Sequence, residues 1–231
     1  VLVKGTRITE VGANVVIPKE ARLIDLRPLT VLPGLIDAHT HITSEGGGER
    51  SLERFVATAG DYAIVGANNA RRMLMAGFTT IRDVGGTDLA DLAVKRAIER
   101  GVIPGPRLFV SLAMISMTGG HGDSSIGLNP RISLGSLTGV ANGVAAVRAM
   151  VRENFKNGAD LIKYAATGGG LDRGVKPNAQ QYTDEEIQAI VDEAHRLGLK
   201  VAAHAHGADG IKTAVKAGTD SIEHGIHLDE E

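Results

Sequence analysis

Residues 156–164 read KNGADLIKY, and the same local pattern occurs at three other places in the chain. A helical segment closes on a glycine, an apolar strand follows, and a polar residue stands at the far end of that strand. The other copies are MAGFTTIRD at 75–83, RLGLKVAAH at 196–204 and KAGTDSIEH at 216–224. Their glycines, Gly77, Gly158, Gly198 and Gly218, suit the left-handed position after a helix. The pattern predicts βα units around a parallel sheet.

Working outward from these copies, we count six strands, at 35–41, 78–83, 107–111, 160–165, 200–206 and 220–224. Thr183 and Glu186 form a capping box that opens the helix ending near Leu197. The even alternation favours a (β/α)₈ TIM barrel, of which this chain covers six strands. A doubly wound open sheet is the alternative, but it usually carries a glycine-rich phosphate loop after an early strand, and none is evident.

The N-terminal residues follow a different pattern. VLVKGTRITEVG at 1–12 alternates apolar and polar residues around Lys4 and Gly5, which predicts a hairpin. Residues 15–34 are expected to continue as short strands and turns. We therefore divide the chain into a small β unit at 1–30 and a main domain at 31–231.

Composition excludes several classes of site. The chain has 25 Lys and Arg against 27 Asp and Glu, so nothing indicates nucleic acid or an acidic membrane surface as a partner. No apolar run is long enough to span a bilayer. Without cysteine, disulfides and thiolate metal sites are excluded, and a metal would need histidine, carboxylate or a less usual ligand. No signal peptide is evident and a cytoplasmic location is favoured, although the chain begins at Val1 without methionine.

Two pairs of histidines share the same spacing. His39 and His41 in LIDAHTHI lie two residues apart on one strand, so their imidazoles project from one face and can share a divalent cation. His204 and His206 in VAAHAHG repeat this spacing, and His224 follows in SIEHG. The alternative is that each is an ordinary polar residue at a strand end.

Lys163 stands in DLIKYAAT among apolar neighbours. A parallel strand of this composition is buried on both faces, where a charged ammonium is costly unless it is paired. Burial favours the neutral amine, which can add carbon dioxide to become a carbamate that bridges two cations. The alternatives are a lysine that extends to the strand end or pairs with Asp160. Barrel enzymes assemble their sites at the carboxyl ends of the strands, so these candidates together predict a metal centre.

Four motifs together resemble the amidohydrolase superfamily: LPGLIDAHTHI at 32–42, IKYAATGGG at 162–170, VAAHAHG at 201–207 and DSIEHG at 220–225. The resemblance is closest to the branch with imidazolonepropionase-like proteins and metal-dependent Xaa-Pro (prolidase-type) dipeptidases, and it covers nearly all of residues 1–231. It implies a (β/α)₈ barrel with a small β-sandwich built from both chain ends.

The resemblance also implies the ligands. Two divalent cations, expected to be zinc, would be held by His39, His41, Lys163, His204 and His224, with carbon dioxide or bicarbonate carboxylating Lys163. His204 is chosen over His206 because the family ligand is the first histidine of that motif. The family's eighth-strand aspartate, which shuttles the proton, has no counterpart here, so we expect the chain to be part of a longer protein.

The activity implied is hydrolysis of an amide bond in a dipeptide or N-acyl amino acid. A cyclic amidase or deaminase is the alternative within enzymes, and a metal-free structural homologue is the alternative of another class. We expect Lys163, His224 and His121 to take part in catalysis, and His121, Tyr164 and His206 to contact substrate. His121 could instead be a loop histidine in solvent. Asp83 is expected to have a structural hydrogen-bonding role, and the protein to form a homo-oligomer.

Overall fold

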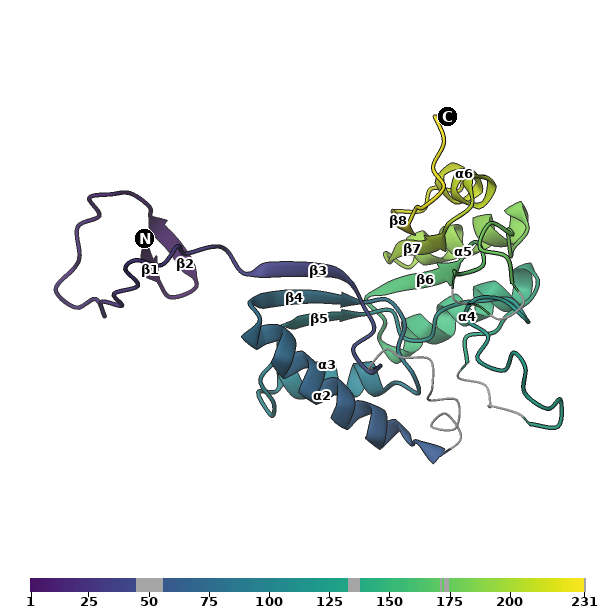
Figure 1. The fold of residues 1–231 in the computed structure, drawn as a ribbon, viewed down its shortest axis with the longest axis horizontal. Coiled ribbons are helices and arrows are strands. Elements are labelled where there is room, and N and C mark those ends of the chain that lie inside the picture. The colour runs from purple at the N-terminus through teal and green to yellow at the C-terminus, as the bar shows by residue number, and fades with distance from the viewer. Residues whose placement is uncertain (45–55, 133–137, 171, 173–174, 231) are drawn as a thin grey trace. The chain divides into compact units, whose positions relative to one another are not determined.

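The computed structural model describes residues 1–44, 56–132, 138–170, 172 and 175–230 (Figure 1). The chain separates into two compact units, Val1–Pro33 and Gly34–Glu231. In the first unit, strands β1 (Leu2–Lys4) and β2 (Arg7–Glu10) pair antiparallel through a turn at Gly5, whose φ is 59°. The hairpin predicted from the alternating pattern is therefore confirmed.

The short strands expected in residues 15–34 are absent, so that prediction is wrong. Pro18, Pro28 and Pro33 interrupt this stretch, and proline has no N–H to donate to a neighbouring strand. Apolar side chains such as Val16 and Leu29 stay exposed. A strand needs a partner strand and a buried face, and residues 15–34 have neither. The two-stranded hairpin is therefore the sheet found in this unit, and the β-sandwich stays a prediction.

The described residues of the second unit contain six strands, each within one residue of its predicted limits. They are β3 (Leu35–Thr40), β4 (Phe78–Asp83), β5 (Arg107–Val110), β6 (Leu161–Ala165), β7 (Lys200–Ala205) and β8 (Ser221–His224). They form two parallel sheets, in the orders β3-β4-β5 and β6-β7-β8.

The segment after β5 joins the two sheets. Ile115 forms a parallel bridge with Tyr164, and the Ile115 N–H donates to the Lys163 carbonyl at 2.8 Å. Strand order therefore follows chain order, as in a barrel wall, whereas a doubly wound sheet reverses its order. Within the described residues β8 does not pair with β3, so the sheets do not close, and an eight-stranded barrel stays a prediction.

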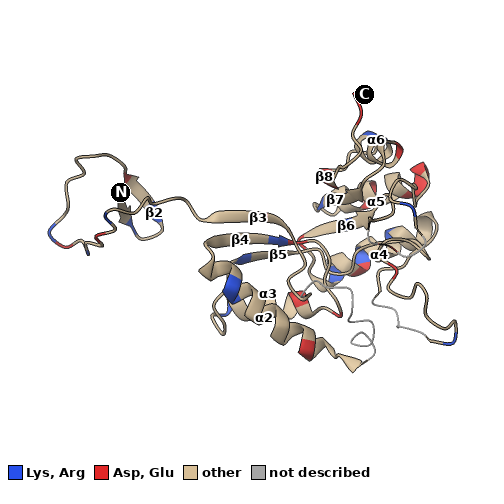
Figure 2. Ribbon diagram, in the orientation of Figure 1, with Lys and Arg blue, Asp and Glu red and all other residues tan. Residues whose placement is uncertain are grey.

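Among the residues that the structure describes, the helices between these strands are α2 (Ala59–Met75), α3 (Ala90–Glu99), α4 (Val144–Asn157), α5 (Asp184–Arg196) and α6 (Ala208–Lys216). The predicted capping box at Thr183 and Glu186 opens α5. All four predicted glycines have positive φ, between 77° and 101°. Figure 2 shows acidic residues near the start of α2 and basic residues near its end, where each complements the helix dipole.

The core determines which way each β6 side chain points. Ile162 and Tyr164 belong to the hydrophobic cluster that packs the second sheet against its helices. Leu161 instead packs with Val84 and Ala202 on the opposite face. Because side chains alternate along a strand, Lys163 shares this opposite face, which is the inner face of the curved wall. No helix in the described part of the chain combines the length and apolarity required to cross a membrane.

Candidate metal centre

All five metal ligands predicted from the sequence line one cavity of about 360 Å³. Its lining comes from the carboxyl ends of strands and the loops that follow them, and consists of His39, His41, Met114, His121, Lys163, Gly170, His204, His206 and His224. The ring centroids of His39 and His224 are 4.7 Å apart, as are those of His204 and His224. Residues from β3, β6, β7 and β8 therefore meet at one place.

Hydrogen bonds fix the proton positions on three of these imidazoles. His41 Nδ1 lies 3.1 Å from the Gly85 carbonyl oxygen, and His204 Nε2 lies 3.2 Å from that of Gly168. A carbonyl only accepts, so each of these nitrogens carries the proton and donates it. His39 Nδ1 likewise donates to the Glu223 carboxylate at 2.7 Å. The free lone pairs are then on Nε2 of His39 and His41 and on Nδ1 of His204.

His204, His206 and His224 form a group of possible ligands, each with a nitrogen within 4.8 Å of the others. His206 is buried, and its Nδ1 has no hydrogen-bond partner among the described residues. An unpartnered polar atom in a buried site is costly unless a ligand or water satisfies it. His206 therefore stands as close to the centre as His204, and the choice of His204 over His206 stays a prediction.

The backbone at His224 departs from strand geometry. Its φ is 74°, in the left-handed region that few residues other than glycine adopt. In a regular strand Glu223 and His224 would point to opposite faces. Here Glu223 contacts His39 while the His224 ring also lies beside His39. The local distortion lets consecutive side chains serve one site, as is common where function imposes strain.

Electrostatics favour neutral imidazoles that can bind a metal. Desolvation and the neighbouring His121 lower the pKa of His204 to about 2, and desolvation and His39 lower the pKa of His224 to about 4. Desolvation also lowers the pKa of His41 and of His206. Because zinc binds the neutral imidazole nitrogen, this donor set fits a divalent cation.

Lys163 is 1% exposed, so it does not extend to solvent. Burial lowers the pKa of its amine to about 8, although the nearby Glu223 raises it. Asp160, the other suggested partner, is taken by Lys95, whose Nζ is 2.6 Å from Asp160 Oδ1. Both alternatives to a buried reactive lysine are therefore wrong.

The comparisons with known proteins agree with this geometry. Residues 30–231 match the model of the amidohydrolase family. The chain belongs to this family. It is 37% identical to an ochratoxinase of Aspergillus niger over 97% of this chain and 50% of that protein.

Solved structures place this amidohydrolase near dipeptidases. A Xaa-Pro dipeptidase with bound methionine matches with a TM-score of 0.79 and 39% identity, over 86% of this chain and 49% of that one. A prolidase complexed with N-methylphosphonate-L-proline matches with a TM-score of 0.85 and 37% identity, over 98% and 56%. The chain thus spans about half the length of the relatives it matches.

His121 lines the histidine cavity and is partly buried, so it is not a histidine that points only to solvent. Its Nδ1 is 2.8 Å from Asp172 Oδ1, and its ring stacks on that of His204. Tyr164 lies elsewhere, because it is fully buried in the helix-facing cluster and its hydroxyl is 2.9 Å from Thr219 Oγ1. This placement gives no support to Tyr164 as a substrate contact.

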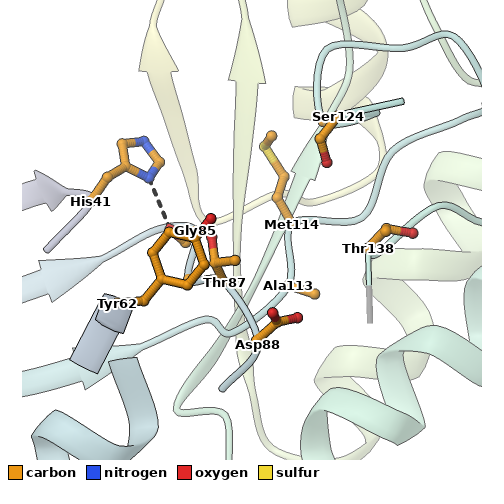
Figure 3. A pocket seen from close by; sticks show the side chains of 11 residues that line it. His41, Tyr62, Gly85, Thr87, Asp88, Ala113, Met114, Ser124 and Thr138 are labelled. Atoms are coloured by element: carbon orange, nitrogen blue, oxygen red, sulfur yellow. Dashed lines mark hydrogen bonds between the residues drawn. The ribbon is translucent and has the colours of Figure 1, made fainter. Parts of the chain in front are cut away.

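A second pocket adjoins the histidine cavity and shares His41 and Met114 with it (Figure 3). Figure 3 shows the hydrogen bond from His41 to Gly85 at one side, and the side chains of Tyr62, Thr87, Asp88, Ser124 and Thr138 around the pocket. The pocket encloses about 230 Å³, enough for a small side chain. It lies directly beside the histidine cavity.

Two carboxylates at the site were missed from the sequence. Glu223 contacts His39, and Asp172 contacts His121. Glu223 could have been found, because it precedes a predicted ligand near the carboxyl end of a strand. Asp172 could not have been found, because no periodic pattern in the sequence predicts the course of the glycine-rich loop before it. Asp83 takes the structural role predicted for it, accepting the N–H groups of Ile42 and Gly85.

Proposed function

We propose that this amidohydrolase is a binuclear-metal enzyme that hydrolyses the amide bond of a dipeptide or an N-acyl amino acid. The observation that carries the proposal is the convergence of neutral histidines and one buried lysine on a single cavity. Such a donor set has no evident structural purpose, because five or more desolvated polar side chains in one cavity cost stability. The names of the matched dipeptidase and prolidase support the substrate class.

In this proposal His39 and His41 would hold one cation, and His204 and His224 would hold the other. Lys163, whose neutral amine can add carbon dioxide and release a proton, would complete the site as a carbamate. When bound, divalent cations lower the pKa of a coordinated water and polarise the scissile carbonyl. Zinc and carbon dioxide are the cofactors that we propose.

The remaining cavity residues would orient the substrate. Asp172 accepts the proton of His121 Nδ1, so Nε2 of the neutral ring has a free lone pair that can accept a hydrogen bond from a substrate N–H. His206 contributes an unpartnered buried nitrogen for the same purpose. The pocket beside His41 would take a substrate side chain, and the exposed Asp88 at that pocket would favour a cationic one.

The experiment is metal analysis followed by a substrate panel. After removal of loosely bound metal, the purified protein should contain about two divalent cations per chain, as a paired-metal hydrolase does. It should hydrolyse dipeptides, including Xaa-Pro, and N-acyl amino acids faster than cyclic amides or aminated heterocycles. Preference for the latter would favour a cyclic amidase or deaminase. A folded protein that binds no metal would favour the metal-free structural homologue and contradict the proposal.

A further inference from the structure

Glu223 connects the first candidate ligand to a partly buried arginine. Its Oε2 is 2.7 Å from His39 Nδ1, and its Oε1 is 2.6 Å from Arg82 Nη2. Ser221 Oγ donates to the same Oε1 at 2.8 Å. The carboxylate is 5% exposed, so these contacts are sheltered from water. A side chain of β8 thus fixes an imidazole of β3 through one oxygen and a guanidinium of β4 through the other.

Arg82 is itself held in place. Its Nε donates to the Ala38 carbonyl at 2.6 Å, and its Nη1 donates to Ser221 Oγ at 3.1 Å. Ala38 is the residue before His39, so the guanidinium spans from the main chain beside the ligand to the carboxylate that contacts the ligand. The planar guanidinium has donors in fixed directions and orients Glu223 more strictly than a lysine would.

The bond from His39 to Glu223 has a consequence for metal binding. Because a carboxylate accepts, the proton of His39 stays on Nδ1, and the lone pair stays on Nε2. A carboxylate acceptor also increases the basicity of the imidazole and holds its plane. His41 and His204 donate instead to main-chain carbonyls, which no side-chain substitution removes. His39 therefore has an acceptor that mutagenesis can change directly.

A purely structural ion pair is the simpler explanation, in which Glu223 fastens β8 to β4. The arrangement of the two oxygens argues against it. Arg82 already reaches β8 through Ser221 and β3 through Ala38. The second oxygen of Glu223 instead contacts the imidazole of His39, a predicted ligand on β3. This contact does not strengthen the link between β8 and β4.

We infer that Glu223 is a positioning residue for the metal centre, anchored by Arg82, and that it sets the affinity for the cation held by His39. The inference rests on the proposed function, since it assumes that His39 binds a cation. It assigns a role to two residues that are not themselves metal ligands.

The test measures metal affinity in the purified, metal-stripped protein, with Zn²⁺ titrated against a chromophoric chelator. Glu223→Ala should weaken the affinity for one of the two cations about 10–100-fold, the usual effect of losing such a partner. Glu223→Gln should lose less, because its amide oxygen still accepts from His39. The same order should appear in the Co²⁺-loaded proteins, as a changed visible spectrum in Glu223→Ala and a nearly normal one in Glu223→Gln.

A matched control is Glu193→Gln, because Glu193 is equally buried and paired with arginines but lies on α5. It should lower the melting temperature without changing Zn²⁺ affinity. Arg82→Lys keeps the positive charge and should weaken Zn²⁺ binding less than Glu223→Ala does. If Glu223→Ala binds both cations as tightly as the wild type, or if Glu193→Gln weakens binding equally, the inference is wrong. If the wild type binds no Zn²⁺, the proposed function fails as well.

Discussion

The imidazole rings of His121 and His204 are stacked, with centroids 3.7 Å apart and planes at 20°. His121 comes from the loop after β5, and His204 comes from β7. Asp172 fixes the edge of His121 through Nδ1, and the main-chain N–H of His121 donates to Gln181 Oε1 at 3.1 Å. Two hydrogen bonds therefore hold a loop histidine in contact with a candidate metal ligand.

His121→Ala is expected to lower kcat/KM about 10–100-fold, which corresponds to losing a hydrogen bond to a charged group. The effect should fall mainly on KM, because the hydrogen bond from a substrate N–H to His121 Nε2 forms on binding. Metal content should not change. His195→Ala is the control, since His195 pairs with Asp220 and does not line the cavity. A His121→Ala protein that loses metal would show that His121 is a ligand instead.

Lys163→Ala should lose metal and activity together, because the bridging carboxylate would be missing. Lys163→Arg should be equally inactive, since a guanidinium stays charged and does not form a carbamate. Adding a short carboxylate such as acetate to the alanine variant should partly restore both metal content and turnover. Bicarbonate should increase the activity of the metal-stripped wild type on reconstitution. Full activity in Lys163→Arg would refute the bridging role.

The strands and the ligand positions could be predicted because both follow from local rules. Gly158 and Gly218 end helices in the left-handed conformation, and the following apolar runs form strands. The alternation along β6 then puts Lys163 on the inner face. The Glu223–His39 contact could not be predicted, since it joins strands far apart in the sequence. The positive φ of His224, which brings its ring to the same site, could not be predicted either.

The expected strands at 15–34 failed for the opposite reason. Short strands were expected there as a continuation of the hairpin, but a strand is stable only when another strand accepts its hydrogen bonds. The expectation that Tyr164 contacts substrate stays a prediction without structural support, because Tyr164 lies in the helix-facing core cluster. Adjacent residues on a strand face opposite sides, so a neighbour of an inner-face residue is a core residue.

Asp88→Asn should change the side-chain preference of the enzyme. Asp88 has φ 51°, and asparagine tolerates this left-handed conformation well, so the substitution should not disturb the loop. For substrates whose side chain carries a cation, kcat/KM should fall about 2–5-fold, the range for an exposed ion pair. Substrates with norleucine in place of lysine should be unaffected. An equal fall in kcat/KM for both kinds of substrate would show that the pocket near His41 does not distinguish charged from uncharged side chains.

Glu193 provides a prediction about stability and pH. This residue of α5 accepts from Arg152 and Arg148 of α4 and from Arg196 of its own helix, and it is 1% exposed. Hydrogen bonds from Arg152 and Arg196, the largest causes, lower the pKa of Glu193 from 4.5 to about 2. Its ionised form is therefore stabilised by folding.

A carboxyl group whose pKa is lowered on folding stabilises the protein above its unfolded pKa and loses that contribution as pH falls through the folded value. Glu193→Gln should therefore lower the free energy of unfolding by about 1–2 kcal/mol near pH 7, after allowing for solvent screening of the partly exposed arginines. The difference from wild type should shrink between pH 4.5 and pH 2. Denaturant unfolding at several pH values measures this directly.

Glu153→Gln, at an exposed glutamate paired with Lys156 of the same helix, is the control and should change stability little at any pH. A Glu193→Gln difference that stays constant down to pH 2 would show that packing, not the ionised carboxylate, links α4 to α5.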